Sequence, residues 1–270
     1  MHRWISTAMA MALAAIASAQ TVYVPAAANA DGVNQTRWLS ELAIKAEGDS
    51  GATFTIELLE SAVDNSDPPS VDGSIGAGEC LRLANVLESE FGFIGTGALR
   101  ITATSGRIIA NSRTFNDDPR GTYGQTVPAV GTDQAASFGG QAALIQLSRS
   151  ADPSVGFRTN IGIVNVTDRS TTVKIGLFAS DATALGTLTR NLKPYEHRQV
   201  NDVFGSLGAD EMHDGYAIAW TTSEEGQFIS YASVVDNQSG DAVFILGAVD
   251  DPVAREQERL VVFEAFLRPG

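Results

Sequence analysis

Apolar and polar residues alternate along much of this 270-residue chain, and this pattern constrains the fold more than any other feature of the sequence. Residues 54–58 (Phe-Thr-Ile-Glu-Leu) and 171–177 (Thr-Thr-Val-Lys-Ile-Gly-Leu) both place apolar side chains on one face and polar ones on the other. Successive side chains of a β-strand point to opposite faces, so the pattern predicts half-buried strands. Clusters of Gly, Asn, Asp and Ser separate these segments as turns, and only 83–90 could form a short helix. The sequence therefore predicts an all-β protein.

The two halves of the chain repeat the pattern in the same order. Residues 38–59 align without gaps on 157–178, at an offset of 119 residues and with five identical pairs. Later blocks, such as 108–116 with 229–237, follow at similar offsets. Repeated strands joined by hairpin turns, without crossover helices, are typical of antiparallel sandwiches. We predict two tandem antiparallel β-sandwich domains of the immunoglobulin-like (Ig-like) kind, related by internal duplication.

Both ends of the chain differ in composition from the repeats. Residues 1–19 combine a basic start, a short apolar run and Ala17-Ser18-Ala19, which together predict a cleaved secretory signal peptide. The apolar run is shorter than the roughly 20 residues that a membrane-spanning helix needs. We expect a secreted protein, either periplasmic or extracellular, with no membrane span after cleavage. The expected divisions are a first module at 20–131, a small polar linker at 132–140, a second module at 141–249, and an extension at 250–270 with one strand.

Net charge and cysteine content narrow the partners. The full chain has a formal charge of −14, and a surface of this sign repels phosphate backbones, so we expect no nucleic-acid binding. Cys80 is the only cysteine, which excludes an intramolecular disulfide. It lies in an alternating segment, 78–83, and this context predicts a buried side chain that acts as a small hydrophobe.

One segment matches a catalytic motif. Gly48-Asp49-Ser50-Gly51 resembles the nucleophile segment of chymotrypsin-like serine proteases, but a serine nucleophile needs a histidine base. In those proteases the histidine precedes the serine, and the only earlier histidine is His2, within the predicted signal peptide. His197, on a polar strand edge, and His213, on an acidic loop, do not form a zinc-binding array. We therefore predict that the protein is not an enzyme.

Two kinds of binding site remain open. Calcium prefers clustered carboxylates, and the acidic turns offer Asp117, Asp118, Asp236 and Asp241, although such turns are common without metal. Tyr216 and Trp220 would form an aromatic patch for carbohydrate if their face of the strand is exposed, and core packing is the alternative. Trp38 aligns with Phe157, and this agreement favours the core for both.

Five runs of residues carry a resemblance to a known kind of module. They are 97–101, 112–116, 121–129, 157–165 and 231–237. Together they resemble an uncharacterised tandem β-module of exported proteins from acidobacteria-like and other Gram-negative bacteria. The resemblance covers most of the chain after the predicted leader and implies an exported, β-rich protein. It implies no activity and no site residues.

These observations lead to three ranked hypotheses about function. The first is a secreted, non-catalytic protein with a structural or partner-binding role, its partner being a protein or polysaccharide at the cell surface. The second is a carbohydrate-binding or calcium-dependent ligand-binding module. The third is a hydrolase with scattered carboxylates, which no catalytic constellation in the sequence supports.

Overall fold

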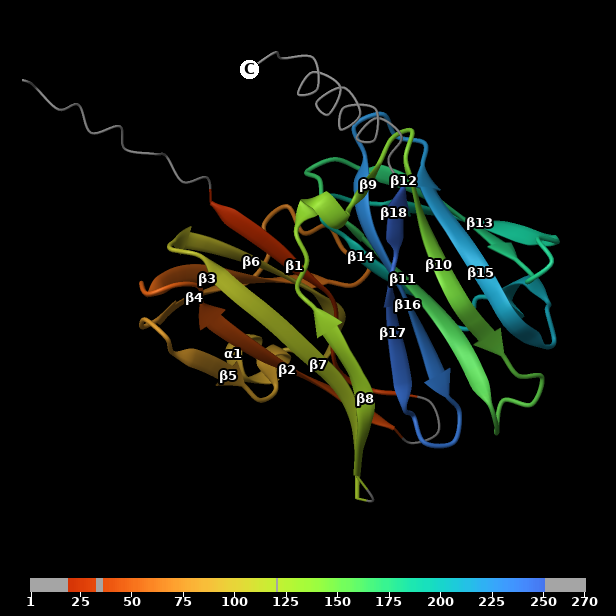
Figure 1. Cartoon of the computed structure of the whole chain (residues 1–270), viewed down its shortest axis with the longest axis horizontal. Helices are drawn as coiled ribbons and strands as arrows, with labels where there is room; N and C mark the ends of the chain where they lie inside the picture. Colours follow the sequence, from red (N-terminus) through yellow and green to blue (C-terminus); the bar gives the residue numbers. More distant parts are fainter. Residues whose placement is uncertain (1–18, 33–35, 120, 251–270) are drawn as a thin grey trace, which may run out of the picture.

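The computed structural model describes residues 19–32, 36–119 and 121–250, and most of them lie in antiparallel strands. The strands form two groups that lie side by side (Figure 1). We call residues 19–130 the first unit and residues 131–250 the second unit. The predicted signal peptide up to residue 18 and the strand expected within 251–270 lie outside the described residues. No helix in the described part of the chain is long and apolar enough to cross a membrane.

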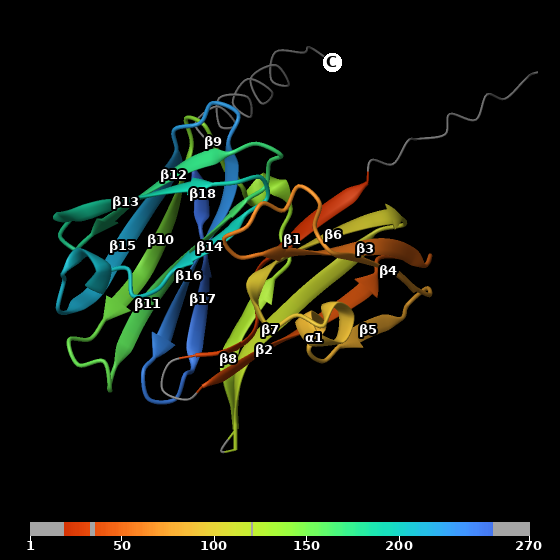
Figure 2. The same ribbon diagram turned by 180° about the vertical axis from the view of Figure 1, so that it is seen from behind.

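The first unit forms an eight-stranded sheet with one short helix. The helix overlaps the region 83–90, where the sequence allowed one, and ends one residue beyond it. Its elements are β1 (Gln20–Asp31), β2 (Arg37–Ala46), β3 (Ala52–Glu60), β4 (Ser70–Ile75), β5 (Cys80–Leu83), α1 (Val86–Phe91), β6 (Gly95–Ser105), β7 (Ile108–Asp118) and β8 (Gly121–Pro128). The pairing order is β4-β3-β6-β1-β2-β7-β8, and β5 pairs with β2. α1 and β5 lie on the side away from the second unit (Figure 2).

The second unit forms two five-stranded sheets. Its elements are η2 (Thr132–Gln134), β9 (Ala136–Ser137), β10 (Gln141–Arg149), β11 (Phe157–Asn165), β12 (Thr171–Phe178), β13 (Ala184–Leu192), β14 (His197–Val200), η3 (Gly205–Leu207), β15 (Met212–Thr221), β16 (Gln227–Asp236), β17 (Ala242–Leu246) and β18 (Ala248–Asp250). One sheet has the order β13-β12-β15-β10-β18. The other has the order β14-β11-β16-β17, and β9 pairs with β16.

The two units order their strands in corresponding ways. The series β4-β3-β6-β1 in the first unit has the same chain order as β13-β12-β15-β10 in the second, and β5-β2-β7-β8 has the same order as β14-β11-β16-β17. An immunoglobulin constant domain instead arranges its strands A-B-E-D and C-F-G. The all-β, antiparallel prediction is therefore confirmed, whereas the strand order departs from the Ig-like one.

Each unit encloses its own apolar core. In the first unit, Leu42, Ile56 and Leu99 are buried on the inward faces of β2, β3 and β6. In the second unit, Ile161 and Ile175 are buried in the same way on β11 and β12. The alternation recognised in the sequence therefore matches the inward face of these strands, since side chains two residues apart share a face.

Two expectations about individual segments need correction. Cys80 is exposed rather than buried, because β5 turns Leu81 and Leu83 toward the core and places Cys80 and Arg82 on the other face. Residues 132–140, expected to be a flexible linker, contain η2 and β9, and Ala136 is fully buried in the core of the second unit. The small side chains of this segment fit it for packing as well as for flexibility.

The units contact each other through a mixed apolar and polar interface. Tyr23, Leu59 and Ala98 of the first unit form one buried cluster with residues of the second unit: Val164, Val166 and Ile229. Beside this cluster, the backbone N–H of Ala62 donates to the carbonyl of His197 at 3.0 Å. The side-chain amide of Asn65 donates to the carbonyl of Tyr195 at 3.1 Å. Apolar burial and hydrogen bonds therefore both fix how the units sit.

Candidate functional site: a cavity between the two units

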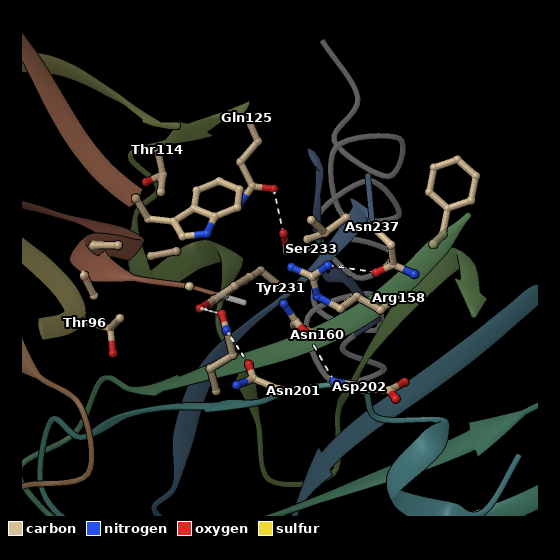
Figure 3. Close-up of a pocket in the computed structure, with 18 of the residues that line it drawn as sticks. Thr96, Thr114, Gln125, Arg158, Asn160, Asn201, Asp202, Tyr231, Ser233 and Asn237 are labelled. Atoms are coloured by element: carbon tan, nitrogen blue, oxygen red, sulfur yellow. Dashed lines mark hydrogen bonds between the residues drawn. The ribbon is translucent and has the colours of Figure 1, made fainter. Parts of the chain in front are cut away.

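A cavity of about 500 Å³ lies between the units (Figure 3). The first unit contributes residues of β1, β2, β6, β7 and β8 to its wall, and the second unit contributes residues of β10, β11, β14 and β16. Trp38 and Phe157 add aromatic surface, and small side chains such as Ala28 leave space. Pockets for small molecules span roughly 300–1,000 Å³, are mainly apolar and hold a few placed polar groups. The cavity fits that description.

The second unit presents a polar strand face to the cavity. On β11, Ile161 and Ile163 point into the core of the second unit, so Arg158 and Asn160 point the opposite way, toward the first unit. Gly162 lies on the same outward face, where a Cβ would come within 2.0 Å of Cζ of Tyr231. Glycine at this position therefore makes room for the Tyr231 ring.

A chain of hydrogen bonds connects the two units beside the cavity. Tyr231 donates its hydroxyl proton to Oε1 of Gln199 at 3.0 Å, so it accepts from Nε2 of His197 at 2.9 Å. With Nε2 protonated, Nδ1 of His197 accepts from the hydroxyl of Ser61, which lies 2.6 Å away in the first unit. His197 is only 2% exposed. Burial, with a smaller contribution from Arg198, lowers the pKa of His197 to about 4.

The Ser61–His197 pair was not foreseen from the sequence, which placed His197 on a polar strand edge. β14 is an edge strand, as expected, but the first unit covers its outer face. In a catalytic pair the histidine takes the serine proton and a third group orients it, commonly a carboxylate. Here the second nitrogen of His197 bonds the neutral hydroxyl of Tyr231, and a histidine whose pKa is near 4 is a weak base. The pair is arranged as a structural connection between the units.

Arg158 and Asn160 take part in two further sets of hydrogen bonds on the wall of the cavity. Arg158 donates from Nη1 to Oδ1 of Asn237 at 2.8 Å. Asn160 accepts the backbone N–H of Asp202 on its Oδ1 at 3.1 Å. The carboxylate of Asp202 accepts from Nε of Arg149 at 2.9 and 3.1 Å. Asp202 also has a positive φ of 43°, which is a strained conformation for a residue other than glycine.

The first unit places Gln125 of β8 on the opposite wall. Its Oε1 accepts from the hydroxyl of Ser233 on β16 at 2.9 Å, so this bond joins the units across the cavity. Both side chains are buried, with exposed fractions of 8% and 5%. Figure 3 shows Gln125, Arg158 and Asn160 around the same space.

Of the four aromatic residues considered in the sequence, Trp38 and Phe157 lie elsewhere than expected. Trp38 and Phe157, both assigned to the core, line the cavity, and Phe157 is 45% exposed. Tyr216 and Trp220 are half-buried on the outer face of β15, while Ala217 and Ala219 occupy its inner face. The ring of Tyr216 stacks on Phe178 with centroids 4.9 Å apart. Small residues therefore fill the core at β15, and the large ones stand outside it.

Two of the acidic residues considered for calcium, Asp236 and Asp241, accept hydrogen bonds from the protein. Oδ1 of Asp236 accepts three hydrogen bonds, from the backbone N–H groups of Gln238 and Ser239 and from the Ser239 hydroxyl. Oδ1 of Asp241 accepts the backbone N–H of Gly124 in the first unit at 3.1 Å. Asp117 and Asp118 end β7. The described residues contain no group of three or more His, Cys, Asp or Glu side chains placed to hold a metal ion. Calcium binding at these turns stays a prediction.

The histidine on the acidic segment has a simple environment. The side chain of His213 is 79% exposed, and its Nε2 lies 3.2 Å from Oε1 of Glu211. The cavity residues differ because another unit covers them. One sequence signal accompanies them: 158–163 alternates polar or small residues with Thr and Ile, which marks a strand face that is not core.

Comparison with known proteins adds no family. The sequence matches no protein-family model and no curated protein. The resemblance to an exported tandem β-module stays a prediction.

Proposed function

We propose that this chain is an exported, non-catalytic binding protein that holds a small ligand in the cavity between its two units. The observation that carries the proposal is the cavity itself. It has the volume of a ligand site, aromatic and small apolar surface, and polar side chains held in place by hydrogen bonds. Binding sites commonly form where two structural units meet.

The hydrogen-bond chain at the cavity wall supports a binding rather than a catalytic role. Its histidine is neutral at physiological pH because its pKa is about 4, and both of its nitrogens are bonded within the protein. A general base is most effective when its pKa is near the working pH. The described residues around His197 therefore serve to fix the two walls of the site.

A fragment screen by ligand-observed NMR tests the proposal. The matched variant is Ala30→Trp, because Ala30 is a partly exposed residue that lines the cavity, and an indole there would fill the space. We expect fragments that bind the wild-type protein and fail to bind A30W, while both proteins give the same circular dichroism spectrum. Recovered ligands should be chemically unchanged. Binding that is identical in the two proteins would place the site elsewhere.

The aromatic row on the second unit is a second candidate. Tyr216 and Trp220 lie on the outer face of β15, with Phe178 stacked on Tyr216, and flat aromatic rows are suited to sugar rings. We propose polysaccharide binding at this row as the alternative function. A pull-down with insoluble polysaccharides, comparing wild type with the double variant Tyr216→Ala/Trp220→Ala, tests it, and retention of both proteins alike argues against the row.

We also propose that the two units arose by internal duplication. Their corresponding registers support this origin: Leu42 pairs with Ser112 and Ile161 with Ala232, while Ile56 pairs with Ile101 and Ile175 with Ala219. The offsets between these positions are close to those of the sequence alignment. Export follows from the predicted signal peptide, and mass spectrometry of the secreted protein, beginning at Gln20, tests it.

A further inference from the structure

The side-chain amides around the cavity differ in how many of their hydrogen-bonding atoms have a partner within the protein. The side-chain oxygens of Gln125, Asn160 and Asn237 each accept a hydrogen bond from within the protein. The side-chain NH₂ groups of Gln125 and Asn160 have no protein partner among the described residues. Gln125 is 8% exposed and Asn160 is 9% exposed, so both residues are at least nine-tenths buried. Buried NH₂ groups normally find an acceptor, and these two line a cavity.

Arg158 adds positive charge on the same wall. It lies two residues before Asn160 on β11, so both side chains are on one strand face. Only Nη1 of its guanidinium is used, in the bond to Asn237, and no salt bridge of Arg158 is present within the described part of the chain. Partial burial lowers the pKa of Arg158, while Asp202 and Asp236 act in the opposite direction.

The two carboxylates that line the cavity, Asp31 and Asp202, already interact with arginines of the protein. Asp202 bonds the guanidinium of Arg149 with both oxygens and also accepts the N–H of Gly205 at 3.3 Å. Asp31, at the cavity rim, is 89% exposed and lies 3.5 Å from Arg37. The NH₂ groups of Asn160 and Gln125, and the guanidinium nitrogens of Arg158 other than Nη1, therefore have no hydrogen-bond acceptor among the described residues.

We propose that the cavity recognises the oxyanion group of a small organic acid. The inference rests on the proposed function and names the class of its ligand. A guanidinium and two NH₂ groups, contributed by both units, would donate to the anionic oxygens, because oxyanions only accept hydrogen bonds. The body of the ligand would lie against Trp38 and the alanines of β1.

Isothermal titration with benzoate, phenyl phosphate and benzenesulfonate tests the proposal, with neutral benzamide as the matched probe. The acids present a carboxylate, a phosphate and a sulfonate on one ring, so their ranking identifies the oxyanion. Charge-assisted hydrogen bonds contribute about tenfold to a hundredfold in affinity. We expect the preferred acid to bind at least about tenfold more tightly than benzamide.

Variants of the two walls then separate charge from shape. Arg158→Gln should remove the preference for the acid and leave benzamide binding unchanged. Gln125→Glu keeps the acceptor for Ser233 and replaces the NH₂ by an oxygen, so it should weaken acid binding from the other unit. Arg107→Gln removes an equal charge at a side chain that is 67% exposed and pairs with Glu47, and it should change neither affinity.

The outcomes distinguish this inference from the proposed function. Equal affinity for acids and benzamide, or acid binding that survives both R158Q and Q125E, overturns the oxyanion assignment. If the acids fail to bind but neutral fragments bind in an A30W-sensitive way, only the assignment of the ligand class is wrong. If no ligand of any kind depends on Ala30, both proposals are wrong.

Discussion

The outer faces of two strand pairs, β2–β7 and β11–β16, have the same place in the strand order and meet different surroundings. In the first unit, Glu41 on this face pairs with Arg82, whose side chain is 69% exposed. At the corresponding register of the second unit, Asn160 is buried against the cavity under the first unit. Strand alternation therefore decides which side chains face away from a core, and the arrangement of the units decides whether water or protein covers them.

The largest difference should appear when valine is introduced at corresponding positions of the two faces. Gly162→Val would force the Tyr231 ring out of its place and disturb the bond to His197, because a Cβ there lies 2.0 Å from Cζ of Tyr231. Overpacking costs roughly 1–3 kcal/mol, so we expect a loss of about 3 kcal/mol when the bond is also lost. Urea unfolding measures it.

The matched control is Ala43→Val on β2. Ala43 pairs with Asn111 as Gly162 pairs with Tyr231, but Ala43 is partly exposed and does not line the cavity. Surface substitutions usually change stability by less than about 0.5 kcal/mol. Equal losses for A43V and G162V would contradict the distinction between the two faces.

The next effect concerns pH. His197 has its pKa lowered from 6.5 to about 4 by burial, so the unfolded chain takes up a proton more readily than the folded protein. The contribution of neutral, buried His197 to the free energy of unfolding is therefore complete above pH 6.5 and decreases as the pH falls toward 4. Between pH 6.5 and 5 this loss is about 2 kcal/mol.

Two histidine variants isolate that contribution. His197→Gln should remove this part of the pH dependence, whereas His213→Gln should retain it, because the side chain of His213 is 79% exposed. Chemical denaturation at a series of pH values measures the slopes. A slope in H197Q equal to that of the wild type would show that His197 does not titrate as its burial requires.

The smallest effect is expected at the exposed ion pair of the first unit. Arg82→Ala removes the partner of Glu41 from a solvent-facing position. Exposed pairs contribute about 0–1 kcal/mol, so the variant should unfold within about 0.5 kcal/mol of the wild type, and raised salt should reduce the difference further. A loss as large as that of G162V would show that this face is also covered in the folded protein.

The sequence was sufficient for the strands of both cores and insufficient for the site. Phe54, Ile56 and Leu58 alternate with polar residues and are buried as predicted. On β15 the same argument was misleading, since Ala217 and Ala219 fill the core and Trp220 stands outside it. A preference for large aromatic residues in cores does not determine the face when both faces are apolar.

The cavity residues escaped prediction for a different physical reason. Asn160 and His197 have the polarity of solvent-facing positions, but both lie against the first unit, where Ser61, the partner of His197, is 136 positions away in the chain. No local pattern records that contact. Cys80 is the opposite case, an apolar residue that is exposed. Leu81 and Leu83 of the same strand pack against the core, so strand alternation places Cys80 on the outer face.

The hydrogen bond between Gln125 and Ser233 means that neither half of the chain contains a complete site. Occupancy of the cavity and association of the halves are then thermodynamically linked, each strengthening the other by the same free energy. A proteolytic cut between β8 and β10 that let the halves separate would release the ligand, even if both cores stayed folded.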